Sequence, residues 1–393
     1  MHTTGQSAVG RTTSPSRRQD PSIQALRGVA VILMVAGHVI GTRGHGLRVG
    51  DSSVWHYVYL SLVDIRMPLF TLISGYVYAM IPISRWRDYP QLIKGKSRRL
   101  LFPLLTVGTV LYVVKRVVPG LNTDVHDIAL WRVYVFQFEY LWFLQSLFLI
   151  FLVVGILDSL GILATRAGWA TVMAVSTVAF VIIDVPGDVD VFTVSRALRL
   201  LPFFLLGYGM RRHRMFDLSG AAAVVTVSAF AGVYAVRMLT IFDVYHPNEL
   251  ADKAIAVGVG ATALVLIYSS RHVLNARPLA WIGGFSFGIY LLHVFATAST
   301  QRVLEHLGLH GDVELFALCL LAGIAAPIAF ELLFRNVWLV RTFVLGERRP
   351  RKAKPARPSG CTDNGNSNGA ISGAADNPAP GRGAGRSVVT PKD

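Results

Sequence analysis

The chain contains ten apolar runs, each close to the length that a helix needs to cross a bilayer. The hydrocarbon core is roughly 30 Å thick, which takes about 20 residues at 1.5 Å per residue. Lipid offers the backbone no hydrogen-bond partner, so such runs fold as helices. The runs are residues 23–42, 56–81, 100–118, 141–158, 168–184, 197–210, 219–239, 254–270, 279–300 and 313–336. They predict an all-α, polytopic membrane bundle of ten transmembrane helices.

Composition agrees with a membrane protein. Of the 393 residues, 53% are hydrophobic and only 16% are charged, whereas soluble domains are about 25% charged. The net charge of +15 does not indicate nucleic-acid binding, because Lys and Arg lie mostly in short loops and in the two terminal segments. Bases in such places hold loops on the cytoplasmic side of a membrane.

The distribution of bases also predicts the topology. If the N-terminus lies in the cytoplasm, every cytoplasmic loop carries a basic residue, and the later outer loops are acidic. The weakest point is the outer segment that holds Lys115, Arg116 and Arg132. The even number of runs places both termini in the cytoplasm. We therefore expect a multi-pass protein of the inner (plasma) membrane.

Polar segments flank the apolar region. Residues 1–21 are rich in Ser, Thr, Gly and Pro, and residues 341–393 in Gly, Pro, Ala and Arg. Neither segment repeats apolar residues at helix or strand spacing. The first is therefore predicted to be a disordered cytoplasmic arm and the second a disordered basic cytoplasmic tail. Residues 22–340 remain as the transmembrane domain.

The first run carries two ionisable residues at unusual positions. Arg27 and His38 are eleven residues apart, which is about three helical turns, so their side chains share one face roughly 16 Å apart. Gly28 and Gly37 flank them and would admit a helix or a ligand. Ionisable groups inside a membrane usually serve a function, although a buried histidine with a structural role remains an alternative on geometry alone.

The second run carries Asp64, Arg66 and Pro68. Residues two apart do not share a helix face, so Asp64 and Arg66 each need water or a partner on another element; a structural ion pair is the alternative to a functional role. Five other ionisable residues lie near run ends and are expected to snorkel to the interface. These are Arg196, Arg199, Arg237, Glu314 and Glu331.

Bases are dense in the predicted cytoplasmic loop 85–99. Lys96 and Arg99 are three residues apart and would share a helical face, an arrangement that suits a phosphate-bearing ligand. On this charge pattern alone, an ordinary basic loop is the better interpretation. Cys319 and Cys361 have no Cys or His partner at metal-binding spacing, and no Gly-x-Ser-x-Gly nucleophile motif is present.

Five stretches together resemble the acyltransferase-3 family of membrane O-acyltransferases, particularly its fucose 4-O-acetylase-like branch. They lie in the same order and at the same spacing as in that family. The stretches are 26–28 with 38, 67–70 with 74–76, 96–103, 141–144, and 202–208 with 285–293. The resemblance implies ten core helices and transfer of an acyl group, expected to be acetyl, from cytoplasmic acyl-CoA to a hydroxyl. The acceptor would be a cell-envelope saccharide or glycolipid, with acetyl-CoA as co-substrate and no metal.

The resemblance also suggests roles for residues. His38 would be the general base, since imidazole titrates near neutral pH, and Arg27 would orient the donor or anchor its phosphates. Lys96, Arg98 and Arg99 would bind the phosphates of CoA.

The remaining candidates surround the acceptor. Arg66 would steady the oxyanion or the acceptor, and Asp64 or Glu139 would orient His38 or bind sugar hydroxyls. Tyr140 and Trp142 would stack on a sugar ring, or else belong to an interfacial aromatic belt. His293, which ends the last matching stretch, is grouped with the acceptor-binding residues.

Three positions depart from the family pattern. Arg66 and Tyr140 stand where relatives commonly carry His, and Lys96 replaces an Arg. If either missing His takes part in proton transfer, this chain must rely on His38 or on another group.

Two other classes of function remain open at this stage. A transporter or flippase for an envelope precursor would use the same polar interior without consuming CoA. A sensor or scaffold would tolerate changes to the polar core.

Overall fold

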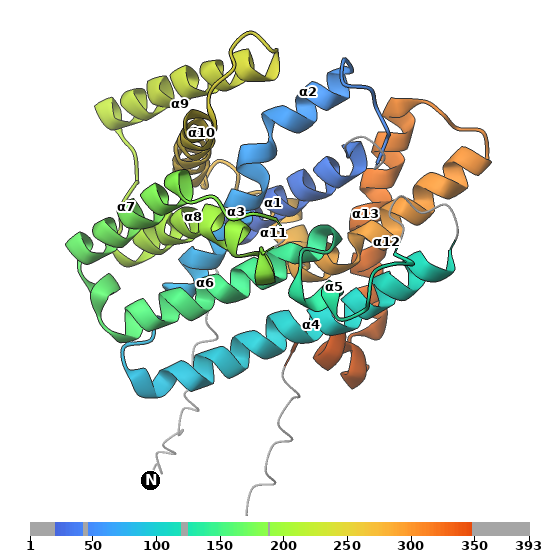
Figure 1. The fold of residues 1–393 in the computed structure, drawn as a ribbon, viewed down its shortest axis with the longest axis horizontal. Coiled ribbons are helices and arrows are strands. Elements are labelled where there is room, and N and C mark those ends of the chain that lie inside the picture. Colours follow the sequence, from blue (N-terminus) through green and yellow to red (C-terminus); the bar gives the residue numbers. More distant parts are fainter. Residues whose placement is uncertain (1–19, 42–45, 119–124, 188, 348–393) are drawn as a thin grey trace, which may run out of the picture. The chain divides into compact units, whose positions relative to one another are not determined.

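The computed structural model of the chain describes residues 20–41, 46–118, 125–187 and 189–347. Within them the fold is all helical, as predicted, without a strand (Figure 1). The α-helices are α1 (Pro21–Ile40), α2 (Val54–Ser61), α3 (Val63–Tyr78), α4 (Tyr89–Val117), α5 (Arg132–Val135), α6 (Trp142–Ser159), α7 (Arg166–Ile182), α8 (Val194–Arg212), α9 (Gly220–Ile241), α10 (Glu249–Ser269), α11 (Arg277–Gly284), α12 (Ser286–His306) and α13 (Asp312–Phe334). Short 3₁₀ turns occupy Trp86–Asp88, Glu139–Leu141, Ile162–Ala164 and Val191–Thr193, and a π-helical turn occupies Val340–Val344.

The prediction of a polytopic membrane bundle is confirmed. In the described part of the chain, eight helical segments are long and apolar enough to cross a membrane. The pair α11 and α12, bent by 78°, makes a ninth if it counts as one span, and α7 is a shorter apolar helix. Each of the ten predicted runs overlaps one of these elements. The side of the membrane on which the termini lie stays a prediction.

Three predicted elements differ from the structure. The run 56–81 forms two helices, α2 and α3, that meet at Leu62. The run 279–300 breaks at Phe285, after two consecutive glycines that favour a helix end. The predicted loop 85–99 is largely helical, because Pro90 starts α4 and good helix formers follow it.

Helix α1 is the central helix and is largely buried. Its N-terminus is capped by the carboxylate of Asp20, which accepts a hydrogen bond from the amide of Ser22 at 3.0 Å. It packs on α11, α3, α12 and α13. A Cβ at Gly28 would overlap the carbonyl of Leu279, and a Cβ at Gly283 would overlap that of Gln24. The two glycines let the backbones of α1 and α11 touch.

A second close contact joins α3 to α8. A Cβ at Gly75 would overlap the carbonyl of Phe204, and a Cβ at Gly207 would overlap that of Leu72. At the edge of the bundle, α9 has no buried residue, as expected of a helix that faces lipid (Figure 1). These contacts hold α1, α3 and α8 around a common interior.

The ends of the folded part differ slightly from the predicted boundaries. Pro21 already belongs to α1, and residues 1–19 of the predicted arm lie outside the described residues. The predicted tail begins inside the π-helical turn, where Arg341 pairs with Glu347 at 2.7 Å. Apolar Leu345 is buried there, which explains why the fold continues past residue 340. The tail from residue 348 lies outside the described residues.

Candidate active site

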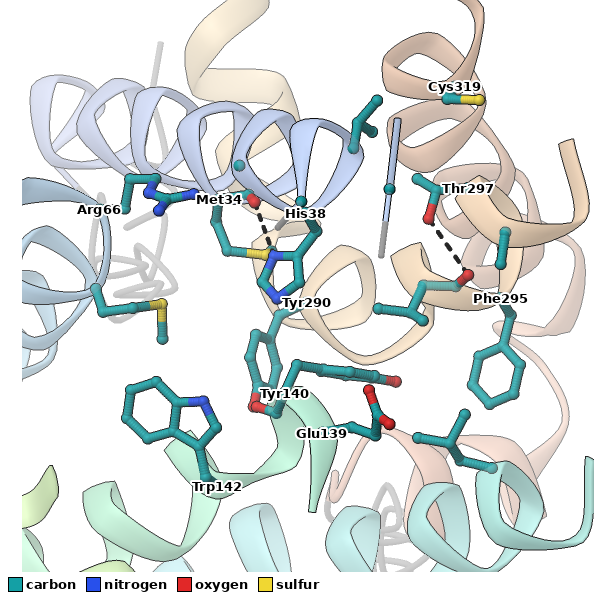
Figure 2. Close-up of a pocket in the computed structure, with 18 of the residues that line it drawn as sticks. Met34, His38, Arg66, Glu139, Tyr140, Trp142, Tyr290, Phe295, Thr297 and Cys319 are labelled. Atoms are coloured by element: carbon teal, nitrogen blue, oxygen red, sulfur yellow. Dashed lines mark hydrogen bonds between the residues drawn. The ribbon is translucent and has the colours of Figure 1, made fainter. Parts of the chain in front are cut away.

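A cavity of about 800 Å³ lies inside the bundle (Figure 2). Its walls come from the C-terminal halves of α1 and α4, from residues 290–302 of α12 and from the N-terminal parts of α3 and α8. The cavity is lined by five of the site residues that the sequence predicts: His38, Arg66, Glu139, Tyr140 and Trp142.

His38 points from α1 into this cavity, toward Tyr140 and Tyr290 (Figure 2). Its Nδ1 lies 2.9 Å from the carbonyl oxygen of Met34, one helical turn earlier. A carbonyl can only accept a hydrogen bond, so Nδ1 carries the proton in the neutral ring. The lone pair of that ring is then on Nε2, which makes Nε2 the basic atom.

His293 lies directly behind His38. The two ring centroids are 4.7 Å apart in an edge-to-face arrangement. His293 is fully buried, and its Nδ1 donates to the carbonyl of Tyr290 at 2.8 Å. It is absent from the described cavity lining, and its grouping with the acceptor-binding residues stays a prediction.

Tyr140 also packs against the histidines. Its ring centroid is 6.2 Å from that of His38 and 5.0 Å from that of His293. Its hydroxyl donates to the carbonyl of Leu291 at 2.6 Å, and its own carbonyl accepts from Tyr290 at 2.7 Å. Only 4% of the residue is exposed. Tyr140 therefore holds α12 to the wall behind His38 and offers little ring surface to a sugar.

Arg66 lies beside His38. Its guanidinium carbon is 4.2 Å from the ring centroid of Tyr59. A Cβ at Gly37, the residue before His38, would overlap the guanidinium. The glycine thus provides the space in which Arg66 rests against α1, one residue before His38.

A salt bridge forms another part of the wall. Nζ of Lys115, on α4, is 2.7 Å from the carboxylate of Glu139. Glu139 has a φ of 48°, a strained value for a residue other than glycine. Strained backbone of this kind is often found at functional sites.

Asp64 is buried outside the cavity lining. Its two carboxylate oxygens lie 2.8 Å from Arg199 of α8 and 2.7 Å from Arg237 of α9. These two arginines, which were expected to snorkel, thus pair with a buried carboxylate of another helix. Asp64 thus has the interhelical partners that its position required, and it is not among the described residues that line the cavity with His38.

Trp142 and Arg196 complete the wall opposite α1. The guanidinium carbon of Arg196 is 4.6 Å from the ring centroid of Trp142. Nε of Arg196 donates to Oε1 of Gln137 at 2.9 Å. The predicted stacking surface of Trp142 is thus shared with a cation.

The predicted donor-binding residues lie outside the cavity lining. Lys96 sits 3.5 Å over the ring of Phe151, and Arg99 sits 4.9 Å over that of Phe287. Nε of Arg98 donates to the carbonyl of Gly346 at 3.4 Å. The charge of Arg99 acts on both Arg27 and Lys96, and that of Arg98 acts on Arg99, so these four bases form one cluster. Three turns of α1 separate this cluster from His38.

Comparison with known proteins identifies the family of the chain. The acyltransferase domain family matches residues 20–332. The chain belongs to the acyltransferase-3 family. This acyltransferase is also similar to peptidoglycan O-acetyltransferase OatA of Listeria monocytogenes, with 24% identity over 75% of this chain and 52% of the relative. It thus spans about half the length of that curated relative. No solved structure matches it. The fucose 4-O-acetylase-like branch stays a prediction.

Several cavity residues of the acyltransferase were not identified as site residues from the sequence. They are cationic or polar, and all except Gln137, which follows α5, come from the outer turns of helices: Lys115, Gln137, Arg196, Arg199, Gln301 and Arg302. A signal was present for Lys115, which breaks the predicted charge rule as a base at an outer helix end. Cys319 lines the cavity, Cys361 lies outside the described residues, and no group of three or more metal-binding side chains occurs within those residues.

Proposed function

We propose that the protein is an integral membrane O-acetyltransferase that moves an acetyl group from acetyl-CoA to a hydroxyl of a cell-envelope saccharide or glycolipid. Membership of the acyltransferase-3 family supports acyl transfer. The similarity to a peptidoglycan O-acetyltransferase supports an envelope glycan as the acceptor and acetyl as the group.

The geometry of His38 carries the proposal. Its Nδ1 is committed to the carbonyl of Met34, so Nε2 is the basic atom of a ring that lines a cavity large enough for a sugar. A base at this position can accept a hydroxyl proton without a change of tautomer.

In the proposed reaction, Nε2 of His38 takes the proton of the acceptor hydroxyl while the hydroxyl oxygen attacks the thioester carbonyl carbon. A tetrahedral oxyanion forms, and the guanidinium of Arg66, which rests against Gly37, would stabilise it. The carbon–sulfur bond then breaks. The imidazolium returns its proton to the departing thiolate, which leaves as CoA, and the ester remains on the acceptor.

The donor would enter from the opposite end. Lys96, Arg98 and Arg99, with Arg27, supply the positive charge that CoA phosphates require. Under the predicted topology this end is cytoplasmic, where acyl-CoA is available, and the cavity lies toward the outer face. The acyl group, still joined to CoA as a thioester, would reach along α1 over the roughly 16 Å that separate Arg27 from His38.

The test is acetyl transfer by the purified full chain in proteoliposomes, with labelled acetyl-CoA and a crude envelope-glycan extract. The wild type is expected to release CoA and label the glycan only when the extract is present. His38→Gln, which keeps a side chain of similar size but removes the base, should lower the rate at least about 100-fold. His246→Ala, at an exposed histidine outside the cavity lining, is the matched control.

A folded His38→Gln variant with wild-type transfer would refute the role of His38. If folded protein released no CoA from acetyl-, succinyl- or longer acyl-CoA with any glycan extract, the transferase proposal would fail. The transporter alternative would then gain support from solute flux without CoA consumption.

A further inference from the structure

We propose that the last described turn of the chain, residues 340–347, is a strap over the predicted donor site, in which the carboxylate of Glu347 competes with the phosphates of acyl-CoA for Arg99. This role rests on the proposed function, because it concerns the binding of the donor in that same reaction. The strap lies beyond residue 332, where the match to the family ends.

The backbone of the strap lies directly on α4, at two of the arginines predicted to bind the donor. Residues 340–344 pack on this helix, and the orange-red end of the ribbon lies beside it (Figure 1). Nε of Arg98 donates to the carbonyl of Gly346 at 3.4 Å. A Cβ at Gly346 would overlap the Cα of Arg99, and the φ of Gly346 is 62°. The strap can therefore come this close to α4 only at a glycine.

Side-chain contacts fix the position of the strap along α4. Oγ1 of Thr106, two turns after Arg99, donates to the carbonyl of Phe343 at 2.7 Å. The ring of Phe343 stacks on that of Phe102, with centroids 6.0 Å apart and planes 13° apart. Leu345 is buried. The strap is therefore a folded element with a defined place beside Arg99.

Glu347 brings a negative charge to the cluster of bases. Both contacts of its carboxylate with Arg341, at 2.7 and 2.8 Å, use the same oxygen, Oε2. Arg341 thus orients the carboxylate without engaging its other oxygen. The charge of Glu347, together with that of Glu331 on α13, acts on Arg99. The strap therefore offsets part of the positive charge that the donor phosphates require.

A carboxylate and a phosphate compete for one guanidinium, because both bind it through negatively charged oxygens. CoA carries several phosphate charges and Glu347 carries one, so the donor should displace the carboxylate. The displacement consumes part of the binding free energy of the donor. The Glu347 side chain is 37% exposed, so water screens its attraction to Arg99. The effect on donor affinity should therefore be about twofold to fivefold.

The experiment measures acetyl transfer by the full chain in proteoliposomes, with saturating envelope-glycan extract and a varied concentration of acetyl-CoA. Glu347→Gln should lower the KM for acetyl-CoA about twofold to fivefold and leave kcat nearly unchanged. The affinity for CoA, measured by calorimetry, should rise by the same factor. Glu314→Gln is the matched control, since this exposed carboxylate lies in the first turn of α13, roughly 25 Å along the helix from Glu331.

Two further arms separate competition from a general effect on the fold. S-acetyl-pantetheine has no phosphate, so Glu347→Gln should leave its KM unchanged. Arg341→Gln releases Glu347 from its partner and should raise the KM for acetyl-CoA, whereas the variant with both changes should behave like Glu347→Gln alone. If Glu347→Gln fails to fold, Phe343→Ala loosens the strap without a change of charge and should lower the same KM.

An unchanged or higher KM for acetyl-CoA in Glu347→Gln would overturn the inference, and so would an equal effect with S-acetyl-pantetheine. A combined variant with a KM above that of the wild type would also overturn it, because Arg341 would then bind the donor itself. His38→Gln is assayed in parallel. Transfer that depends on His38 but ignores Glu347 refutes only the strap, whereas transfer that survives His38→Gln refutes the proposed function.

Discussion

Gly37→Ala should disable the enzyme without unfolding it. The new Cβ would occupy the space of the Arg66 guanidinium, which is the mobile end of a long side chain. To restore an ordinary separation of ~3.5 Å, the guanidinium must withdraw by about 2 Å. A shift of even ~1 Å in a catalytic group can lower the rate about 100-fold, which corresponds to ~2.7 kcal/mol of transition-state stabilisation.

The stability of the fold should change little. Alanine in place of glycine inside α1 favours the helix by about 1 kcal/mol. Loss of the contact between Arg66 and the ring of Tyr59 costs about 1–2 kcal/mol. The two terms nearly cancel, so the melting temperature of the detergent-solubilised protein should stay within a few degrees of that of the wild type.

The assay is the initial rate of CoA release in proteoliposomes, with melting followed by size-exclusion chromatography after heating. Gly232→Ala is the matched control, because it adds the same Cβ inside α9 with nothing near it. If Gly37 acts through Arg66, the variant that combines Gly37→Ala with Arg66→Gln should be no slower than Arg66→Gln alone. A Gly37→Ala enzyme within threefold of wild type, or multiplicative losses in the combined variant, would refute the reasoning.

Three further predictions concern the bundle around the site. Gly207→Ala places a Cβ against the carbonyl of Leu72 and should destabilise the protein by about 1–3 kcal/mol, seen as a lower melting temperature; an unchanged melting curve would contradict the close contact. Asp64→Asn removes the carboxylate that pairs with Arg237 and should lower the free energy of unfolding by about 3–5 kcal/mol. Thermal melting would detect this loss, and an unchanged melting temperature would show that the pair is dispensable. Tyr140→Phe loses one hydrogen bond to α12 and should cost only about 1 kcal/mol. Its acetyl-transfer rate should therefore fall severalfold at most, and a 100-fold loss would give the hydroxyl a catalytic role.

Much of the fold follows from local physics that the sequence displays. An apolar run in lipid must satisfy its own backbone hydrogen bonds, so it forms a helix whatever its neighbours are. The same regularity puts Arg27 and His38 on one face of α1 without the help of any tertiary contact. Apolar length alone does not reveal a break inside a run, such as the one at Leu62.

The partners of the polar side chains were decided only by the tertiary structure. Asp64 meets Arg199 and Arg237, which follow it by 135 and 173 residues. His293 reaches the ring of His38 only because α12 packs on α1. Such pairings depend on how each helix is rotated about its axis and shifted along it. Many distant packing contacts set these quantities together, and no local pattern in the sequence records them.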